Sequence, residues 1–123
     1  MKKIMIIDDE IDFLTIAKMN LEATGKYEIM TLLSGVDIIK YVAEFKPDII
    51  LLDIVMPKID GVKVCKILKG DSESAEIPII ALTALDTDED RLAMHKSGVV
   101  DFLTKPIEKD VLISKIEEVL QGN

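Results

Sequence analysis

An aspartate ends one of the most apolar stretches of the chain. Residues 49–52 read Ile-Ile-Leu-Leu, and Asp53 follows them directly. A carboxylate at the end of a buried strand costs free energy unless another group or a ligand interacts with it. Two further acids, Asp8 and Asp9, end the first apolar stretch in the same way. If the two stretches lie side by side in a sheet, the three carboxylates meet at one edge.

Carboxylates so close together repel one another by on the order of a few kcal/mol per pair at an effective dielectric constant of about 20. A divalent cation relieves this repulsion. Mg²⁺ is the natural choice because it prefers oxygen ligands and is commonly held by one or two carboxylates and a phosphate; Mn²⁺ could replace it. The alternative is that Asp8 or Asp9 caps the following helix, since aspartate is a favoured N-cap residue. Two adjacent acids opposite a third favour the metal site.

A carboxylate beside a metal ion can also attack a phosphoryl group, and this transfer needs cations that spread the charge on the phosphoryl oxygens. Lys105 ends the last apolar stretch and offers a compact positive charge. Thr83 ends the fourth stretch and offers a hydroxyl donor. We therefore predict that Asp53 accepts a phosphoryl group whose oxygens bind Thr83 and Lys105. Taken singly, these last two residues could be an ordinary strand-end threonine and a surface lysine.

Hydrophobic periodicity predicts the elements that must position these residues. Five short apolar runs alternate with five amphipathic, helix-like segments, and the runs cover residues 3–7, 27–32, 48–52, 78–82 and 99–103. Four runs are nearly continuous in Ile, Val and Leu, as in strands buried on both faces of a parallel sheet, whereas the mixed second run suits an edge strand. The pattern predicts a three-layer, doubly wound (βα)5 α/β fold of the flavodoxin-like type, with parallel sheet order 2-1-3-4-5. Such sheets bind ligands at the carboxyl ends of their strands, where all the residues named above lie.

Composition restricts the function further. The chain has 123 residues, of which about half are apolar, and this predicts one folded domain over residues 1–123. A net charge of −8 argues against direct binding of nucleic acid. No apolar stretch approaches the ~20 residues of a membrane span. Cys65 has no cysteine partner and the N-terminus lacks a signal-peptide pattern, so we expect a reducing, cytoplasmic location.

These residues, together with their neighbours, resemble the receiver domain of two-component response regulators. The motifs occur in order along essentially the whole chain and are Asp8-Asp9, Asp53 with Met56-Pro57 and Asp60-Gly61, Thr83-Ala84, and Lys105-Pro106. The resemblance implies a phosphorylation-dependent signalling switch rather than an enzyme, apart from its own phosphotransfer and a slow autodephosphorylation. It also implies that the phosphoryl donor is a phosphohistidine of a sensor histidine kinase or of a histidine phosphotransfer protein.

The resemblance assigns roles to individual residues. Four groups should bind Mg²⁺, namely Asp9 directly, Asp8 through water, Asp53, and the backbone carbonyl of Val55. Three groups should bind the phosphoryl oxygens, namely Thr83, the backbone of Ala84, and Lys105. The peptide bond before Pro106 should be cis, which agrees with the small cis penalty of X-Pro bonds.

The resemblance further implies how the signal leaves the site. Thr83 should move toward the phosphoryl group, and the aromatic residue three positions before Lys105, here Phe102, should then turn inward. Because Phe102 lacks the hydroxyl of a tyrosine, its rotamer should depend less on phosphorylation; the alternative is an ordinary core residue. The output face should comprise the fourth helix, fifth strand and fifth helix. It would contact a downstream protein, a fused effector domain or, on phosphorylation, a second copy of the chain.

Two apolar residues predict a long-lived phosphorylated state. Val55 lies two positions after Asp53, and Leu85 lies two positions after Thr83. In the family, the residues at these positions influence how a hydrolytic water reaches the acyl phosphate. Neither of these side chains can orient a water molecule, so we expect slow hydrolysis.

Three other functions compete with this one. A Mg²⁺-dependent phosphatase with an aspartyl nucleophile needs an acid two positions after the nucleophile, where this chain has Val55. A flavin-binding electron carrier would place a phosphate against Asp8, Asp9 and Glu10, which would repel it. A degenerate receiver would bind partners without phosphorylation, yet all the residues that phosphorylation requires are present.

Overall fold

The computed structural model of the protein describes residues 1–56, 60–84 and 87–122. In these ranges, five strands alternate with five helices along the chain. The strands are β1 (Lys2–Ile7), β2 (Tyr27–Leu32), β3 (Ile49–Asp53), β4 (Ile79–Thr83) and β5 (Asp101–Thr104). The helices are α1 (Ile11–Glu22), α2 (Ile38–Phe45), α3 (Gly61–Lys69), α4 (Asp88–Ser97) and α5 (Lys109–Gln121). This alternation confirms the predicted α/β class.

The strands form one parallel sheet in the order β2-β1-β3-β4-β5, as the sequence pattern predicted. Every residue of β3 and β4 is buried, which explains why these two runs are almost purely aliphatic. β2 lies at an edge of the sheet and is only partly buried, which explains its mixed composition. The strand order reverses between β1 and β3, so their carboxyl ends form the switch point where such sheets bind ligands.

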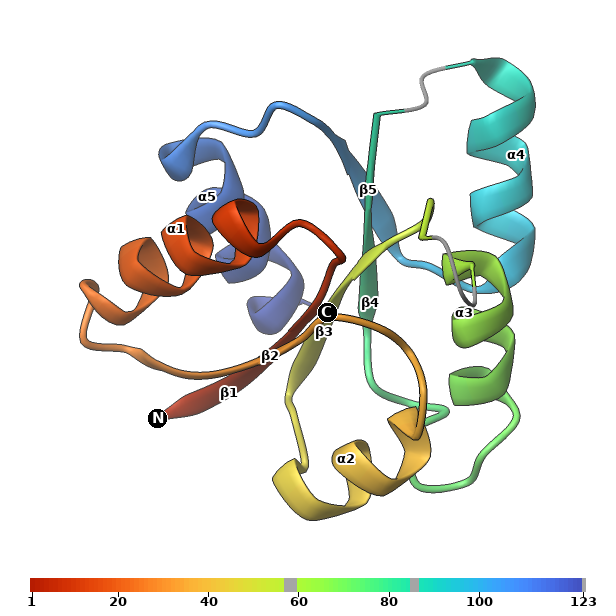
Figure 1. The fold of residues 1–123 in the computed structure, drawn as a ribbon, viewed down its shortest axis with the longest axis horizontal. Coiled ribbons are helices and arrows are strands. Elements are labelled where there is room, and N and C mark those ends of the chain that lie inside the picture. Colours follow the sequence, from red (N-terminus) through yellow and green to blue (C-terminus); the bar gives the residue numbers. More distant parts are fainter. Residues whose placement is uncertain (57–59, 85–86, 123) are drawn as a thin grey trace.

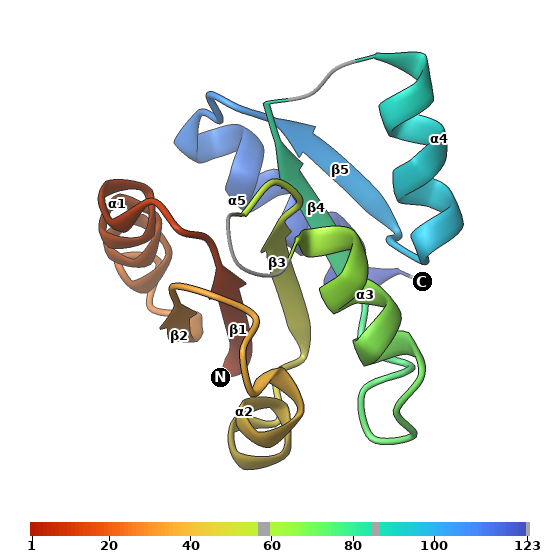
Figure 2. The same cartoon turned by 45° about the vertical axis from the view of Figure 1, so that its right-hand side comes forward.

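Helices cover both faces of the sheet, with α1 and α5 on one face and α2, α3 and α4 on the other (Figures 1 and 2). Successive strand residues point to opposite faces and therefore belong to different halves of the core. Ile4 and Ile6 of β1 pack with Leu14 of α1, whereas Met5 of the same strand belongs to the cluster that contains Val64 of α3. This alternation fixes the orientation of β1 between the two halves of the core.

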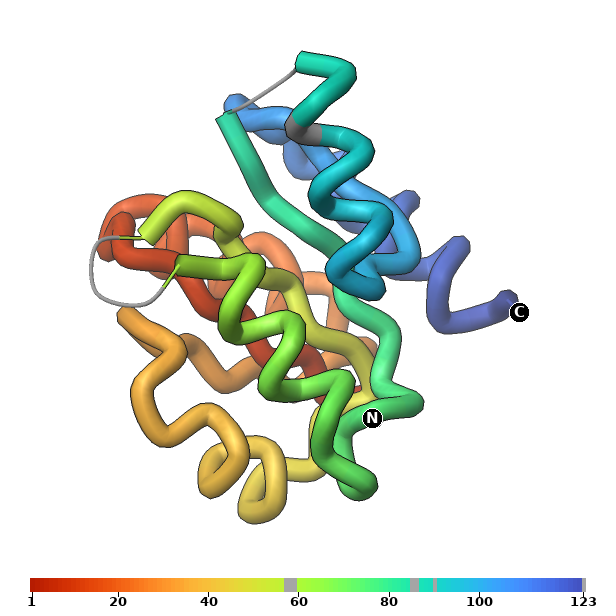
Figure 3. The backbone as a smooth tube through the Cα atoms, turned by 90° about the vertical axis from the view of Figure 1, so that its right-hand side faces the viewer, coloured from red at the N-terminus to blue at the C-terminus, as the bar shows by residue number. Residues whose placement is uncertain are grey.

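α3 and α4 lie side by side on their face of the sheet (Figure 3). The buried thiol of Cys65 in α3 donates a hydrogen bond to the carbonyl of Ser97 at the end of α4 (3.0 Å). The cysteine is therefore a packing residue between the two helices. In the part of the chain that the structure describes, no helix is both long and apolar enough to cross a membrane.

The ends of four strands differ from the predicted ranges. β1 begins one residue earlier than predicted. β3 and β4 begin and end one residue later than predicted, so Asp53 and Thr83 are the last residues of their strands. The ladder continues through the acid because Asp53 pairs with Leu82 of β4. β5 begins two residues later than predicted because the chain is still turning out of α4 after Gly98, whose φ is +103°.

Candidate functional site

Asp53 is buried at the carboxyl end of β3, where it is 5% exposed. Its Oδ1 accepts a hydrogen bond from the backbone N–H of Val55 (3.0 Å), and its Oδ2 lies 3.6 Å from Nζ of Lys105. Burial raises the pKa of Asp53 to about 6; the charge of Asp8 adds to this rise, whereas the Val55 N–H and Lys105 oppose it. The ionised carboxylate is therefore under-compensated and would be stabilised by additional positive charge.

Asp8 follows β1 and is fully buried beside Asp53. Its Oδ1 accepts a hydrogen bond from the backbone N–H of Glu10 (2.9 Å), and its Oδ2 accepts one from Nζ of Lys105 (2.6 Å). The N-cap residue of α1 is Glu10, whose side chain makes no capping hydrogen bond. The alternative prediction that Asp8 or Asp9 is the N-cap of this helix is therefore wrong.

Three acids, Asp8, Glu10 and Asp53, bring carboxylate oxygens within 4.8 Å of one another among the described residues. The sequence pattern predicted Asp9 in this group and missed Glu10. In the structure, Asp9 is exposed, whereas the carboxylate of Glu10 turns back toward the site. The only signal for Glu10 in the sequence is its position directly after the acidic pair. The metal-binding roles of Asp8, Asp9, Asp53 and the Val55 carbonyl stay predictions.

Lys105 supplies the positive charge at this edge of the sheet. Its ammonium group donates to Asp8 (2.6 Å) and Glu10 (2.7 Å) and lies 4.6 Å from the centre of the Phe13 ring. Burial by itself lowers the pKa of Lys105, but the hydrogen bonds to Asp8 and Glu10 and the nearby carboxylate charges raise it overall. The lysine side chain, which is 14% exposed, therefore stays cationic inside the site.

The carboxyl end of β4 and the residues after β5 complete the site. Thr83 is buried, and its carbonyl accepts a hydrogen bond from the backbone N–H of Lys105 (2.7 Å). Ala84 follows it and is exposed. The peptide bond between Lys105 and Pro106 is cis, as the resemblance implied. The structure thus brings Asp8, Asp53, Thr83 and Lys105 together at the carboxyl ends of the strands.

Phe102 in β5 is half-buried and packs against the core on the face that α2, α3 and α4 cover. The guanidinium group of Arg91 in α4 lies 5.2 Å from the centre of its ring, which is a cation–π distance. A core residue and a switch residue would both make these contacts, so the switch role of Phe102 stays a prediction. Leu85 and Pro57 lie outside the described residues.

The chemistry of these donors fits a hard divalent cation. Mg²⁺ prefers carboxylate oxygens and is commonly held by few protein ligands together with a phosphate. Asp8 and Asp53 are both buried, and Lys105 is their cationic partner. A metal ion and this lysine would together compensate both the carboxylates and a phosphoryl group.

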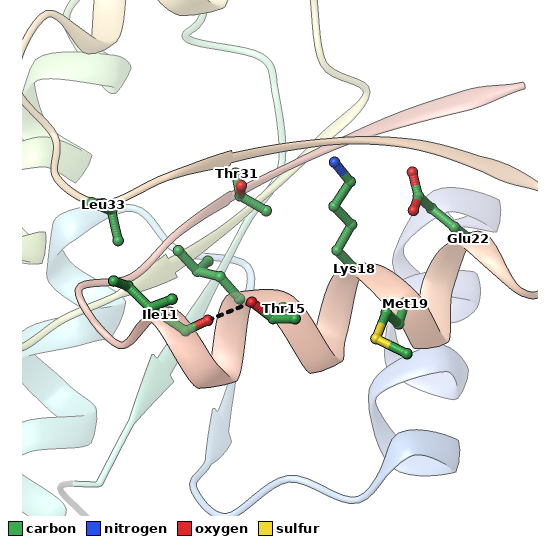
Figure 4. Close-up of a pocket in the computed structure, with 8 residues that line it drawn as sticks. Ile11, Thr15, Lys18, Met19, Glu22, Thr31 and Leu33 are labelled. Atoms are coloured by element: carbon green, nitrogen blue, oxygen red, sulfur yellow. Dashed lines mark hydrogen bonds between the residues drawn. The ribbon is translucent and has the colours of Figure 1, made fainter.

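Among the described residues, grooves lie on two sides of α1. One, of about 600 Å³, lies between α1 and β2, and Figure 4 shows Ile11, Thr15, Lys18, Met19, Glu22, Thr31 and Leu33 lining it. The other, of about 480 Å³, lies between α1 and the start of α5, and its lining includes Glu10, Phe13, Ala84, Lys105 and Pro106. The second groove is therefore continuous with the acid-and-lysine site, whereas the first contains none of the residues predicted for phosphoryl chemistry.

Residues 4–117 match the family model of the response regulator receiver domain. The chain belongs to this family. Receiver domains of two-component response regulators are signalling domains whose general function is switching by phosphorylation. They act together with histidine kinases and effector domains.

Named relatives of this receiver agree with the family match. It is 34% identical over 121 residues to the DNA-binding dual master transcriptional regulator RpaA of Synechocystis sp., covering 98% of this chain and 50% of RpaA. It is 33% identical over 122 residues to protein PilH of Pseudomonas aeruginosa, covering 99% of this chain and 100% of PilH. The BeF3-activated N-terminal receiver domain of Klebsiella pneumoniae RstA superposes with a TM-score of 0.88 and 27% identity, covering 98% of this chain and 100% of that one. The receiver therefore spans half the length of RpaA and all of PilH.

Proposed function

We propose that this receiver accepts a phosphoryl group on Asp53 from a phosphohistidine of a sensor histidine kinase or a histidine phosphotransfer protein, in a Mg²⁺-dependent reaction. The observation that carries the proposal is the position of Asp53. It is buried at the carboxyl end of β3, between a second buried acid, Asp8, and the ammonium of Lys105. In the transfer, a carboxylate oxygen of Asp53 forms a bond to phosphorus while the bond from phosphorus to the histidine nitrogen breaks. The released imidazole keeps the electron pair of the broken bond.

In this proposal, one set of groups binds the metal ion and another binds the phosphoryl oxygens. The metal ligands would be Asp8, Asp9, Asp53 and the backbone carbonyl of Val55. A bound Mg²⁺ ion, for which Mn²⁺ could substitute, would neutralise charge on the phosphoryl oxygens as they approach the carboxylate. The hydroxyl of Thr83, the backbone N–H of Ala84 and the ammonium of Lys105 would bind the phosphoryl oxygens. The backbone N–H of Lys105 donates a hydrogen bond to the carbonyl of Thr83, so a shift of one residue would displace the other.

The output side of the proposal involves Phe102 and the face formed by α4, β5 and α5. Movement of Thr83 toward the phosphoryl group would change the packing beneath β5 and favour an inward rotamer of Phe102. Arg91 of α4 contacts the same ring, so this rotamer change would alter the surface of α4. The altered face would bind a downstream protein, a fused effector domain or a second copy of the receiver.

Incubation with Mg²⁺ and acetyl phosphate, followed by mass spectrometry of the intact protein, tests the acceptor. Wild type should gain one phosphoryl group, and Asp53→Asn should gain none. Asp12→Asn is a matched control because it removes an exposed acid in the first turn of α1, and it should behave as wild type. A gain that persists in Asp53→Asn would assign the acceptor elsewhere. No gain in wild type would favour a receiver that binds partners without phosphorylation.

We also infer that the phosphorylated receiver is long-lived. Val55 is adjacent to the site through its N–H bond to Asp53, yet its exposed side chain is apolar and offers nothing that could orient a water molecule. The combined change Val55→Asn and Leu85→Glu should shorten the lifetime by roughly ten- to a hundredfold, because positioned polar groups accelerate proton transfer to or from an attacking water. The measurement is the loss of phosphoryl mass after acetyl phosphate is removed. Equal decay of wild type and double variant would contradict the inference.

A further inference from the structure

Glu10 was not predicted to belong to the phosphoryl site, yet its carboxylate binds the ammonium of Lys105. Its Oε1 lies 2.7 Å from Nζ of Lys105, almost as close as the buried Asp8 at 2.6 Å. Asp53, the proposed acceptor, lies farther away at 3.6 Å. The lysine is therefore shared mainly between Asp8 and Glu10.

The two carboxylates that hold Lys105 differ in how easily they can release it. Asp8 is fully buried, so losing its cationic partner would leave an uncompensated charge inside the protein. The side chain of Glu10 is 62% exposed, so water can solvate its carboxylate after it leaves the lysine. Glu10 is consequently the partner of Lys105 that can be exchanged for another anion.

A phosphoryl group on Asp53 would be that other anion. It carries up to two negative charges and several acceptor oxygens, all of which compete with Glu10 for the same ammonium. If Glu10 stayed at 2.7 Å from Nζ, its charge would also repel the phosphoryl oxygens across the shared lysine. Both effects make the carboxylate of Glu10 unfavourable for the phosphorylated state.

We infer that Glu10 is a positioning residue that holds Lys105 in the unphosphorylated receiver and competes with the phosphoryl group for it. The inference rests on the proposed function of Asp53 and adds a residue that lowers the affinity of the site for the phosphoryl group. Glu10 belongs to the same three-acid group as Asp8 and Asp53, so the competing role for its carboxylate is that of a direct metal ligand. The two roles predict opposite results when the carboxylate is removed.

Calorimetric titration separates these roles with two ligands, Mg²⁺ alone and beryllofluoride in saturating Mg²⁺. Glu10→Gln should bind beryllofluoride about two- to fivefold more tightly than wild type, since an ion pair with one exposed member is weak. Its affinity for Mg²⁺ should change by less than about threefold, because Gln removes one nearby charge but no ligand. Glu10→Asp keeps the charge but shortens the side chain by one methylene, so it should behave like Glu10→Gln.

Two controls test whether the effect passes through Lys105. Asp12→Asn removes one negative charge from the first turn of the same helix, and it should leave beryllofluoride affinity within about twofold of wild type. In a Lys105→Met background, Glu10→Gln should no longer strengthen beryllofluoride binding, because the residue through which Glu10 acts is absent. An equal gain in Asp12→Asn, or a gain that survives in Lys105→Met, would overturn the inference.

The remaining outcomes distinguish this inference from the proposed function. Unchanged or weaker beryllofluoride binding by Glu10→Gln, with wild type binding normally, would overturn the inference alone. A tenfold or greater loss of Mg²⁺ affinity in Glu10→Gln would instead identify Glu10 as a metal ligand. A wild-type receiver that binds Mg²⁺ but no beryllofluoride would contradict the proposed function and, with it, the role of Glu10.

Discussion

At the scale of single residues, the chemistry of Asp53 depends on its surroundings rather than on its residue type. The carboxyl group is buried, Asp8 adds a like charge, and Lys105 lies 3.6 Å from it but binds two other acids more closely. Burial and the charge of Asp8 raise the pKa of Asp53 from its ordinary value of 3.8 to about 6, although the Val55 N–H and Lys105 oppose this rise. The folded receiver without metal therefore favours the protonated acid more than the unfolded chain does.

This raised pKa makes the stability of the receiver depend on pH. Stabilisation by the protonated form is complete below the unfolded-state pKa near 3.8 and is lost as the pH rises through about 6. Asn cannot ionise, so Asp53→Asn should gain stability relative to wild type between pH 4 and pH 7.5, by on the order of 1–2 kcal/mol. Thermal unfolding of both proteins in EDTA measures this difference.

The surface variant Asp12→Asn is the control for the pH experiment, and its stability relative to wild type should change less with pH because Asp12 is exposed. A difference between Asp53→Asn and wild type that is constant or shrinks as the pH rises would show that the burial of Asp53 does not disfavour its ionised form.

At the scale of elements, the site depends on how closely α3 follows β3. The first residue of α3, Gly61, donates its N–H to the carbonyl of Ile54 (2.8 Å), and an added Cβ there would collide with the backbone of Asp53 and Ile54. The side chain of Asp60 caps the same helix by accepting a hydrogen bond from the N–H of Lys63 (2.9 Å). The Asp60-Gly61 motif of the sequence thus has a geometric meaning: a capped helix that begins in contact with the acceptor strand.

Gly61→Ala should therefore displace the start of α3 from the end of β3. We expect a loss of roughly 1–3 kcal/mol in the free energy of unfolding, since inserted atoms in a close-packed contact force the backbone to move. Phosphorylation by acetyl phosphate should slow as well, because Asp53 contributes the contacted carbonyl. Chemical denaturation and the rate of mass gain measure the two effects.

Gly70→Ala, at the other end of α3, is a suitable comparison for Gly61→Ala. Its added Cβ would meet two carbonyl oxygens of its own helix, at 3.3 and 3.7 Å, and neither contact is a severe clash, so both effects should be smaller. Equal behaviour of the two variants would mean that the contact at Gly61 is not special to the site.

At the scale of the whole molecule, the acids of the site are part of a strongly negative protein. The net charge of −8 opposes the compact state, and so does the repulsion between the buried carboxylates of Asp8 and Asp53. A bound cation would relieve the repulsion between these two carboxylates. A ligand that binds only the folded state stabilises it according to its concentration relative to its Kd.

Mg²⁺ should therefore raise the unfolding temperature of wild type, and EDTA should reverse the rise. At ten times its Kd the expected gain is about 1.4 kcal/mol. Asp53→Asn should gain clearly less, since one proposed ligand is lost. NaCl at matched ionic strength controls for general screening of the net charge. The same gain from Mg²⁺ in both proteins would show that the ion acts by screening and not at this site.

Much of this protein was predictable from its sequence because the relevant patterns are local. Unbroken aliphatic runs predict buried parallel strands, and their alternation with amphipathic segments predicts the observed order β2-β1-β3-β4-β5. Since the carboxyl ends of parallel strands meet at one edge, the order also brings Asp8, Asp53, Thr83 and Lys105 together. Strand ends were shifted by one or two residues because pairing with the neighbouring strand, rather than hydrophobicity, decides where a strand ends.

Only the tertiary structure decided which acids after β1 face the site. Asp8, Asp9 and Glu10 are equivalent in a sequence pattern, since each is an acid beside the end of a strand. The path of the turn into α1 buries Asp8 and exposes Asp9, and Lys105, which is 95 residues away in the chain, attracts the carboxylate of Glu10. Side-chain direction in such a turn depends on the backbone path and on partners distant in sequence, and neither is encoded in local periodicity.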